Sequence, residues 1–243
     1  MNAQYNELNK LEILHKARSW FAQSIAANHV QNTQKLSNPK NFNINPFLVT
    51  YLANFLTGDN SPESIAKALL YPRVLGTSIT TSFGTNIQKF ASDVLSGFGS
   101  MISGIDIEFV DQIDFRRKFC QLKAGPDTIN KDDVESIHGH FNSAINLART
   151  NNLPISHDDL IIGVLYGQAD QLNGHYKRLE SQYFHPLFVG QDFWHRLTGD
   201  PEFYFDLINQ FAIVAKEIDG SELLQDTIDQ LAQSEPIKRI ANK

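Results

Sequence analysis

The side chains best suited to chemistry lie in the middle of the chain, where the pattern is typical of two β-strands joined by a short polar turn. Alternation of apolar and polar residues predicts strands over residues 105–112 and 116–124. Gln121 and Lys123 then share one face of the second strand, and Asp106 lies across from them if the strands pair. One acid, one amide oxygen and one ammonium group form a minimal site for a divalent cation and a water.

Composition limits the class of protein. The chain has 243 residues, of which 42% are hydrophobic and 20% charged, so it can bury a full core as one domain. No stretch approaches about 18 uninterrupted apolar residues, which argues against a transmembrane span. The polar N-terminus lacks the basic and apolar regions of a signal peptide. The single cysteine, Cys120, cannot form an intrachain disulfide, so we expect a buried core thiol in an intracellular protein.

The formal net charge of −6 argues mildly against a nucleic-acid-binding protein, because such proteins often have basic surfaces. It does not exclude one. Steering of DNA depends on the local field, so acidic metal ligands and a basic groove can coexist on one chain.

Hydrophobic periodicity and capping residues predict helices on both sides of the strands. We expect helices over residues 5–29, 47–56, 63–70, 85–95, 132–149, 192–197, 202–216 and 222–233. Asn45 and Pro46 suit the start of the second helix, which ends at Gly58. The polar stretch 31–43 is expected to be a loop, and Tyr71-Pro72-Arg73 to interrupt a helix.

Two further strands are expected after the central pair. The apolar run 160–166 fits a strand that is buried on both faces and pairs in parallel after a helical crossover. Residues 184–189 predict another strand. The resulting order indicates an α/β fold, with a mixed central sheet flanked by helices and preceded by an N-terminal helical region.

The hydroxyl-rich stretch 77–84 precedes the predicted helix 85–95. Exposed backbone and hydroxyl groups at a helix start suit contact with phosphate, which makes Thr81 and Ser82 candidates for DNA contact. The alternative is ordinary helix capping.

The helix–strand–strand–helix–strand order with Asp106, Gln121 and Lys123 resembles the PD-(D/E)xK nucleases, with Gln where the second acid usually stands. Five further stretches are similar, in the same order, to type II restriction endonucleases, including enzymes that cut GGNCC-type palindromes. They are Ile44-Asn45-Pro46-Phe47, Pro72-Arg73-Val74-Leu75-Gly76, Leu122-Lys123-Ala124-Gly125, Gly163-Val164-Leu165-Tyr166-Gly167 and Gly190-Gln191-Asp192-Phe193-Trp194. The resemblance covers roughly residues 40–215, and the order and spacing of the stretches carry it.

The resemblance implies a single nuclease domain over residues 1–243. Its expected parts are an N-terminal helical region (1–70), a PD-(D/E)xK catalytic core (77–190) and C-terminal helices (191–243). The implied activity is Mg²⁺-dependent hydrolysis of double-stranded DNA at a short palindromic, GC-containing site of GGNCC type, leaving 5′-phosphates. A palindrome implies a homodimer. A cognate DNA methyltransferase as genetic partner and a prokaryotic cytoplasmic location also follow from the resemblance.

The resemblance also assigns roles. Asp106 is the principal metal ligand, joined by the Gln121 side-chain oxygen and the Leu122 backbone carbonyl, because Mg²⁺ prefers oxygen ligands. Lys123 orients or deprotonates the water, or stabilises charge on the phosphorane. Glu108 shares the Asp106 face. It is a candidate for binding a second metal ion or for supporting the groups that bind the first. A neutral amide at 121 implies lower metal affinity or a one-metal site.

Other acids compete for these roles. Asp111 and Asp114 are rivals near the turn, where acids are commonly just solvated, and Gln88 stands where related nucleases place an upstream acid. Without the resemblance, a surface salt bridge is the simpler interpretation of Asp106 and Lys123.

The candidates for DNA contact carry basic, hydroxyl or amide groups. They are Arg73, Thr81, Ser82, Arg116, Arg117, Lys118, Thr128, Asn130, Lys131, His175, Tyr176, Lys177 and Arg178. Arg reads guanine bidentately, whereas Lys more often meets phosphate. The segments 125–131 and 167–178 are favoured because both follow strands of the core sheet.

The remaining aromatic and histidine residues have simpler interpretations. Phe193, Trp194 and Leu197 are expected to pack in the core or a dimer interface rather than to stack on bases. His138 and His140 should point apart on a helix, which argues against a shared zinc site.

Two other functions stay open. A DNA-binding protein could keep the nuclease fold without the chemistry, as Gln121 and the acidic net charge allow. A repair or recombination nuclease with the same core would act on DNA structure rather than on sequence.

Overall fold

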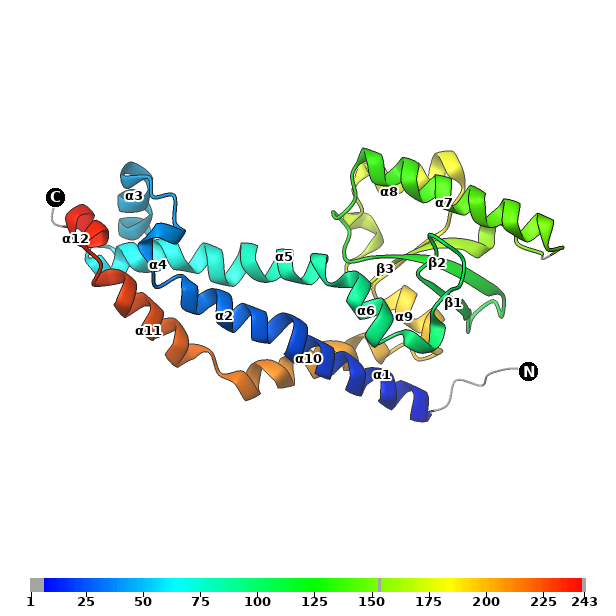
Figure 1. Ribbon diagram of the computed structural model, residues 1–243, viewed down its shortest axis with the longest axis horizontal. Helices are drawn as coiled ribbons and strands as arrows, with labels where there is room; N and C mark the ends of the chain where they lie inside the picture. Colours follow the sequence, from blue (N-terminus) through cyan, green and yellow to red (C-terminus); the bar gives the residue numbers. More distant parts are fainter. Residues whose placement is uncertain (1–6, 153, 242–243) are drawn as a thin grey trace. The chain divides into compact units, whose positions relative to one another are not determined.

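The computed structural model describes residues 7–152 and 154–241 (Figure 1). The chain divides into two compact units, which we call the sheet unit and the helical unit. The sheet unit contains the chain up to Trp20 and residues Asn86–Phe211. The helical unit contains Phe21–Thr85 and Ala212–Lys243.

The sheet unit is built on one four-stranded mixed sheet. Its strands, in spatial order, are β1 (Ile107–Val110), β2 (Arg117–Lys123), β3 (Leu160–Val164) and β4 (Leu187–Val189). β1 pairs antiparallel with β2, and the other neighbours pair in parallel. This arrangement confirms the predicted mixed sheet flanked by helices, although each strand is shorter than the sequence pattern indicated.

Six helices belong wholly or partly to the sheet unit. They are α1 (Glu7–Trp20), α6 (Ile87–Asp93), α7 (Lys131–Thr150), α8 (Gly174–Tyr183), α9 (Gln191–Thr198) and α10 (Phe203–Ile218), which continues into the helical unit. α7 is the predicted crossover between β2 and β3, and α8 links β3 to β4.

α7 and α8 cover one face of the sheet (Figure 1). The Asn130 side chain caps α7 by accepting from the N–H groups of Asp132 and Asp133, and the Asp133 carboxylate accepts from the Asn130 N–H in return. The apolar side of α7, including Ile137 and Phe141, packs on β2 and β3 in one buried cluster. The cap therefore fixes where α7 begins above the sheet.

α6 and α9 lie on the opposite face (Figure 1). Phe193 fills the space over Gly163 and Cys120, and the Trp194 Nε1–H donates to the Leu165 carbonyl at 2.9 Å. Phe193, Trp194 and Leu197 are buried, which confirms their predicted packing role. Cys120 is also fully buried, as predicted, and burial raises the pKa of its thiol.

The loops after β3 and β4 meet closely at the carboxyl ends of the parallel strands. Gly190 has a positive φ of 52°, and a Cβ there would collide with the Gly167 carbonyl oxygen. A side chain at Gly190 would push the two loops apart, and a Cβ at Gly167, which has a φ of 106°, would collide with the Pro126 ring, which explains why glycines stand in the two similar stretches noted above.

The helical unit has its own core. Its main helices are α2 (Ala27–Lys35), α3 (Pro46–Thr57), α4 (Pro62–Pro72), α5 (Ser78–Thr85), α11 (Ser221–Ala232) and α12 (Glu235–Ala241). Buried side chains of α3, α4, α11 and α12 form one cluster, which includes Val49, Ile65 and Leu231. Asn45 caps α3 and Gly58 ends it in the left-handed conformation, as predicted.

Helices extend beyond their predicted ends at two places, and each passes through a π turn. α1 continues through a π turn (Phe21–Ala26) into α2, so the helix predicted to end at residue 29 reaches Lys35 and shortens the expected loop. α4 continues through a second π turn (Arg73–Thr77) into α5. Pro72 lacks an N–H, and the Ser78 N–H reaches back to the Arg73 carbonyl, so a wide turn accommodates the missing donor.

The expected boundaries near residues 70, 77 and 190 do not coincide with the compact units. The reason is that α11 and α12, from the far end of the chain, pack on α4. α12 itself was not predicted. The single nuclease domain stays a prediction. Among the described residues, no helix has the length and apolar character needed to cross a bilayer.

Candidate active site

Asp106 lies immediately before β1, beside β2. Its N–H donates to the Cys120 carbonyl at 2.9 Å, which continues the antiparallel ladder by one bond. Its carboxylate Oδ2 accepts from the Leu122 N–H at 2.7 Å, and Oδ1 accepts from Nε2 of Gln88 on α6 at 3.3 Å. The carboxylate is therefore held against the backbone of the residue between Gln121 and Lys123.

The Leu122 carbonyl points to the same side of β2 as the Leu122 N–H, which contacts Asp106. The N–H and C=O groups of one strand residue point toward the same neighbouring strand. The Leu122 N–H faces Asp106, whereas the Lys123 carbonyl accepts from Leu165 N on the β3 side. Because β1 begins at Ile107, opposite Cys120, Leu122 lies beyond its end. The Leu122 oxygen is thus directed toward the side on which the Asp106 carboxylate lies.

The Gln121 side chain faces α7. Its Nε2 donates to the Gly104 carbonyl and to Nδ1 of His140, the latter at 2.7 Å. The side chain is buried, with 6% of the residue exposed. Both amide hydrogens are used by these two acceptors, which leaves the amide oxygen for another partner.

Lys123 also faces α7. Its Nζ lies 3.3 Å from Oδ1 of Asp133, and the lysine side chain is 23% exposed. Asp133 is the acid of the α7 capping box, so the cap places a carboxylate beside this ammonium group. In the described part of the chain, Lys123 pairs with Asp133 and not with Asp106.

The rival acids serve other contacts. Glu108 accepts from the Ser100 hydroxyl at 2.6 Å and lies 3.7 Å from Arg117. Asp111 is fully buried and pairs with Arg196 at 2.9 Å. Asp114 pairs with Lys118 at 2.6 Å. These contacts hold the β1–β2 turn and its surroundings, so Asp106 is the one of these four acids that contacts the Gln121–Lys123 segment.

The donors fit a hard divalent cation. Each Asp106 oxygen accepts one hydrogen bond and keeps a lone pair. The Gln121 amide oxygen and the Leu122 carbonyl add neutral oxygen donors, and Mg²⁺ commonly completes its shell with water and substrate phosphate. No group of three or more His, Cys, Asp or Glu side chains among the described residues could hold a metal. Any cation here therefore depends on amide and carbonyl oxygens.

Three candidate DNA contacts lie in the helical unit. Arg73 is exposed in the π turn, and Thr81 is exposed on α5 with Ser82 half-buried beside it. The stretch 77–84 was expected to precede a helix, but it lies mostly within α5. Its backbone N–H groups are therefore used by the helix, and the stretch is not the helix start that the sequence predicted. Contact of Thr81 and Ser82 with phosphate stays a prediction.

The basic residues of β2 and its turn are engaged in ion pairs. Arg116 binds the Asp159 carboxylate at 2.7 Å, and this hydrogen bond raises the pKa of Arg116. Lys118 is only 2% exposed and pairs with Asp114. Because Lys118 is buried in this way, it does not reach DNA from this position.

The two segments favoured for DNA contact adjoin, as their positions after neighbouring strands suggested. The Asn173 side chain donates to Asp127 and to the Ile129 carbonyl, each at 3.0 Å. The Tyr176 hydroxyl donates to the Gly125 carbonyl at 2.9 Å and lies 3.2 Å from the Thr128 hydroxyl. These contacts join the β2–α7 turn to the start of α8.

Some of the candidate side chains on these two segments are used in contacts within the protein. Tyr176 is fully buried, Thr128 bonds the turn and Asn130 caps α7, so their side chains serve structure. Burial also raises the pKa of Tyr176. The remaining candidates on these segments are Lys131, His175, Lys177 and Arg178. Their side chains are exposed or half-buried. Arg178 also donates to Gln182 at 2.7 Å.

Sequence reasoning missed two residues of this site, His140 and Asp133. Both lie on α7, seven residues apart, and so on the same side of the helix. The Asn130-x-x-Asp133 spacing is a capping-box signal that could have placed Asp133. His138 does point away from His140, as expected: it stacks on Tyr183 with ring centroids 3.9 Å apart.

Comparison with known proteins identifies the family. The family model described as Type II restriction endonuclease EcoO109I matches residues 19–219, which is most of the chain. The match includes β1, β2 and all the site residues described above. Comparison with curated proteins finds no match.

Proposed function

Because the chain belongs to the type II restriction endonuclease family described as Type II restriction endonuclease EcoO109I, we propose that it cuts double-stranded DNA at a short palindromic, GC-containing site. The proposed site is of GGNCC type, the proposed cofactor is Mg²⁺, and the products carry 5′-phosphates. The sheet is proposed to be a PD-(D/E)xK core. The observation that carries this proposal is the Asp106 carboxylate bonded to the Leu122 N–H, between Gln121 and Lys123.

In this proposal Asp106, Gln121 and the Leu122 carbonyl hold the cation. A bound Mg²⁺ supplies Lewis-acid chemistry, lowering the pKa of a water and offsetting charge on the phosphate. Gln88 and the Leu122 N–H orient the Asp106 carboxylate. The Lys123 ammonium group orients the attacking water and stabilises negative charge that develops on the phosphorane.

The proposed DNA surface follows β2 and β3. Lys131, Lys177 and Arg178 supply positive charge from two segments that are bonded to each other, and His175 lies on α8 with Lys177 and Arg178. Lys contacts position phosphates, and an Arg in the major groove would read guanine. The roles of Arg73, Thr81, Ser82 and Arg116 in DNA contact stay predictions.

We also propose that the enzyme is a homodimer, because a palindromic site calls for two symmetric active sites. An apolar face of α3 supports this part of the proposal. Six large side chains of this helix are exposed: Phe47 (88%), Leu48 (59%), Tyr51 (63%), Leu52 (44%), Phe55 (78%) and Leu56 (49%). α3 carries no charged residue, so a symmetric copy would meet no like charge across a two-fold axis.

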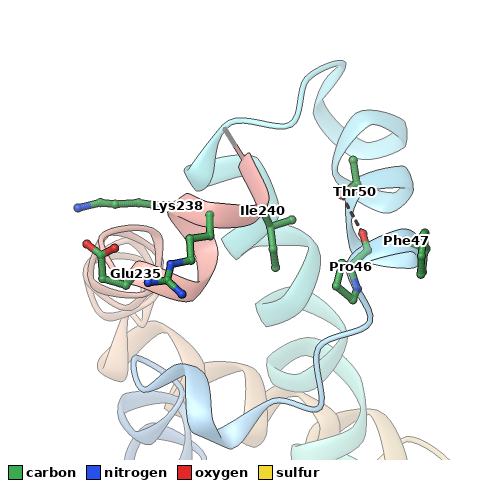
Figure 2. Close-up of a pocket in the computed structure, with 7 residues that line it drawn as sticks. Pro46, Phe47, Thr50, Glu235, Lys238 and Ile240 are labelled. Atoms are coloured by element: carbon green, nitrogen blue, oxygen red, sulfur yellow. Dashed lines mark hydrogen bonds between the residues drawn. The ribbon is translucent and has the colours of Figure 1, made fainter. Parts of the chain in front are cut away.

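The area of this face suits a dimer interface. The six side chains expose on the order of 700 Å² if large side chains present about 150–250 Å² each. A standard interface buries about 800 Å² per partner. A hollow adjoins the start of α3, where Figure 2 shows Pro46 and Thr50 across from Ile240, with Glu235 and Lys238 farther out. An apolar centre with a charged rim is the usual anatomy of such interfaces.

A cognate DNA methyltransferase is proposed to protect the host genome, and a prokaryotic cytoplasm is the proposed location. The test uses purified protein with unmethylated phage DNA, in Mg²⁺ and in EDTA. Discrete Mg²⁺-dependent fragments support the proposal, and mapping their ends gives the site and stagger. Metal-independent binding without cleavage would favour an inactive DNA-binding protein, and cuts confined to junctions or flaps would favour a repair nuclease.

A further inference from the structure

We infer that His140 is a positioning residue for this site: together with the Gly104 carbonyl, it orients the Gln121 amide so that the oxygen faces the cation. The inference rests on the proposed metal site. It concerns position 121, where the chain has Gln in place of the second acid of the nucleases that it resembles.

A glutamine ligand presents a problem that a glutamate ligand does not. Both carboxylate oxygens can bind a cation, but a carboxamide has one oxygen and one NH₂ group. The NH₂ group cannot ligate and would present its hydrogens to the cation. A Gln in this place is therefore useful only if the surroundings distinguish its two ends.

The Gly104 carbonyl makes this distinction. A backbone carbonyl only accepts hydrogen bonds, so the end of Gln121 that contacts it must be the NH₂ group. His140 Nδ1 lies 2.7 Å from the same nitrogen and must then accept the second hydrogen. Its own ring hydrogen is consequently on Nε2. The reversed amide would place its oxygen against the Gly104 carbonyl oxygen, which has no hydrogen to give.

The packing holds the two acceptors together. Gly104 has a φ of 81°, and a Cβ at this position would come within 2.5 Å of the His140 ring. The ring thus lies directly against the Gly104 backbone. His140 is fixed along α7 by its neighbour Phe141, which is fully buried in the cluster beneath the helix. Gln121 is itself buried, so water competes poorly for its NH₂ group.

The test compares substitutions that keep or remove the acceptor. In His140→Asn, the side-chain oxygen can take the place of Nδ1, whereas His140→Leu and His140→Ala supply no acceptor. Asn146→Ala, at an exposed position farther along α7, is the matched control. Mn²⁺ binding to the DNA-free protein is measured by electron paramagnetic resonance, which requires no turnover. Thermal unfolding reports whether each variant is folded.

We expect His140→Leu and His140→Ala to weaken Mn²⁺ binding about 10-fold, the lower end of the range for groups that orient metal ligands. His140→Asn and Asn146→Ala should stay within about threefold of the unsubstituted protein. Unchanged binding in both Leu and Ala variants would overturn the inference, as would equal loss in His140→Asn. Asp106→Ala tests the metal site itself, apart from the role of His140. If this variant binds Mn²⁺ as well as the unsubstituted protein, the proposed site and this inference both fail.

Discussion

The Asp106 carboxylate accepts a 2.7 Å hydrogen bond from the backbone N–H of Leu122, two residues beyond Cys120, where the pairing between β1 and β2 ends. The bond occupies a backbone N–H that β1 could reach only if its pairing with β2 were two residues longer. It holds an acid and a backbone carbonyl at the same strand edge, with Gln121 and Lys123 on either side in the sequence. The proposed chemistry depends on that arrangement.

Asp106→Asn should abolish most cleavage while leaving the fold intact. The amide keeps the shape of the side chain but removes the carboxylate that contacts the Leu122 N–H. We expect the cleavage rate in Mg²⁺ to fall by about 10²–10³, as loss of several kcal/mol of metal-assisted stabilisation implies. Plasmid cleavage assays measure the rate, and DNA affinity without metal should change little. Near-normal cleavage by Asp106→Asn would remove Asp106 from the site.

Asp133→Asn tests the contact between the capping box and Lys123. The substitution weakens the cap and should cost about 1 kcal/mol of folding stability. It also frees the Lys123 ammonium group, so the cleavage rate should fall while DNA affinity is kept. Asp132→Asn is the control, because it removes the same charge from the first turn of α7 without touching Lys123. Equal cleavage rates in the two variants would exclude a role for the Lys123–Asp133 pair.

Gln121→Glu should not tighten metal binding, although a carboxylate is intrinsically the stronger ligand. A glutamate carboxylate has no hydrogen to give to the Gly104 carbonyl, which only accepts, so this carbonyl oxygen would face its charge. Titration with Mn²⁺ at pH 8 measures the affinity. A clear gain in affinity would contradict the idea that the surroundings are built for an amide.

Phe55→Ser should weaken the proposed dimer without unfolding the helical unit, because Phe55 is 78% exposed on α3. Sedimentation velocity at micromolar concentration is expected to show a shift toward monomer. Leu75→Ser is the matched control: Leu75 is 67% exposed in the same unit but lies outside α3. A dimer that resists Phe55→Ser and Phe47→Ser together would place the interface elsewhere.

Acid should destabilise the sheet unit through His185. Burial, together with nearby His138 and His157, lowers the pKa of His185 to about 4, from an ordinary value of 6.5. The folded state then binds fewer protons than the unfolded state between these values, so stability is complete above pH 6.5 and falls as pH drops toward 4. The loss is roughly 3 kcal/mol at most. His185→Phe should flatten this part of the curve of unfolding free energy against pH.

The central strands could be predicted from the sequence because alternation and apolar runs are local signals. β2, β3 and α7 follow directly from residues such as Ile161 and the cap at Asn130. Asp106, Gln121 and Lys123 could be placed on neighbouring strands for the same reason. The partners of Gln121 and Lys123 could not: a capping-box signal can place Asp133 at the start of α7, but its contact with Lys123, like that of His140 with Gln121, depends on how α7 packs on the sheet.

The helical unit was harder to predict, for two physical reasons. Pro72 normally ends a helix, but here it is followed by a π turn that restores the hydrogen-bond ladder. α11 and α12 pack on α4 from more than 100 residues away in the sequence, so the unit is held by long-range burial. Neither effect can be read from the spacing of neighbouring residues.

The most direct test of the account is cleavage of unmethylated phage DNA by the purified protein and by Asp106→Ala, side by side in Mg²⁺. The account predicts discrete fragments from the unsubstituted protein, none in EDTA, and intact DNA with the variant. Intact DNA from the well-folded unsubstituted protein in both Mg²⁺ and Mn²⁺, on several substrates, would contradict it. So would a variant that cuts as well as the original.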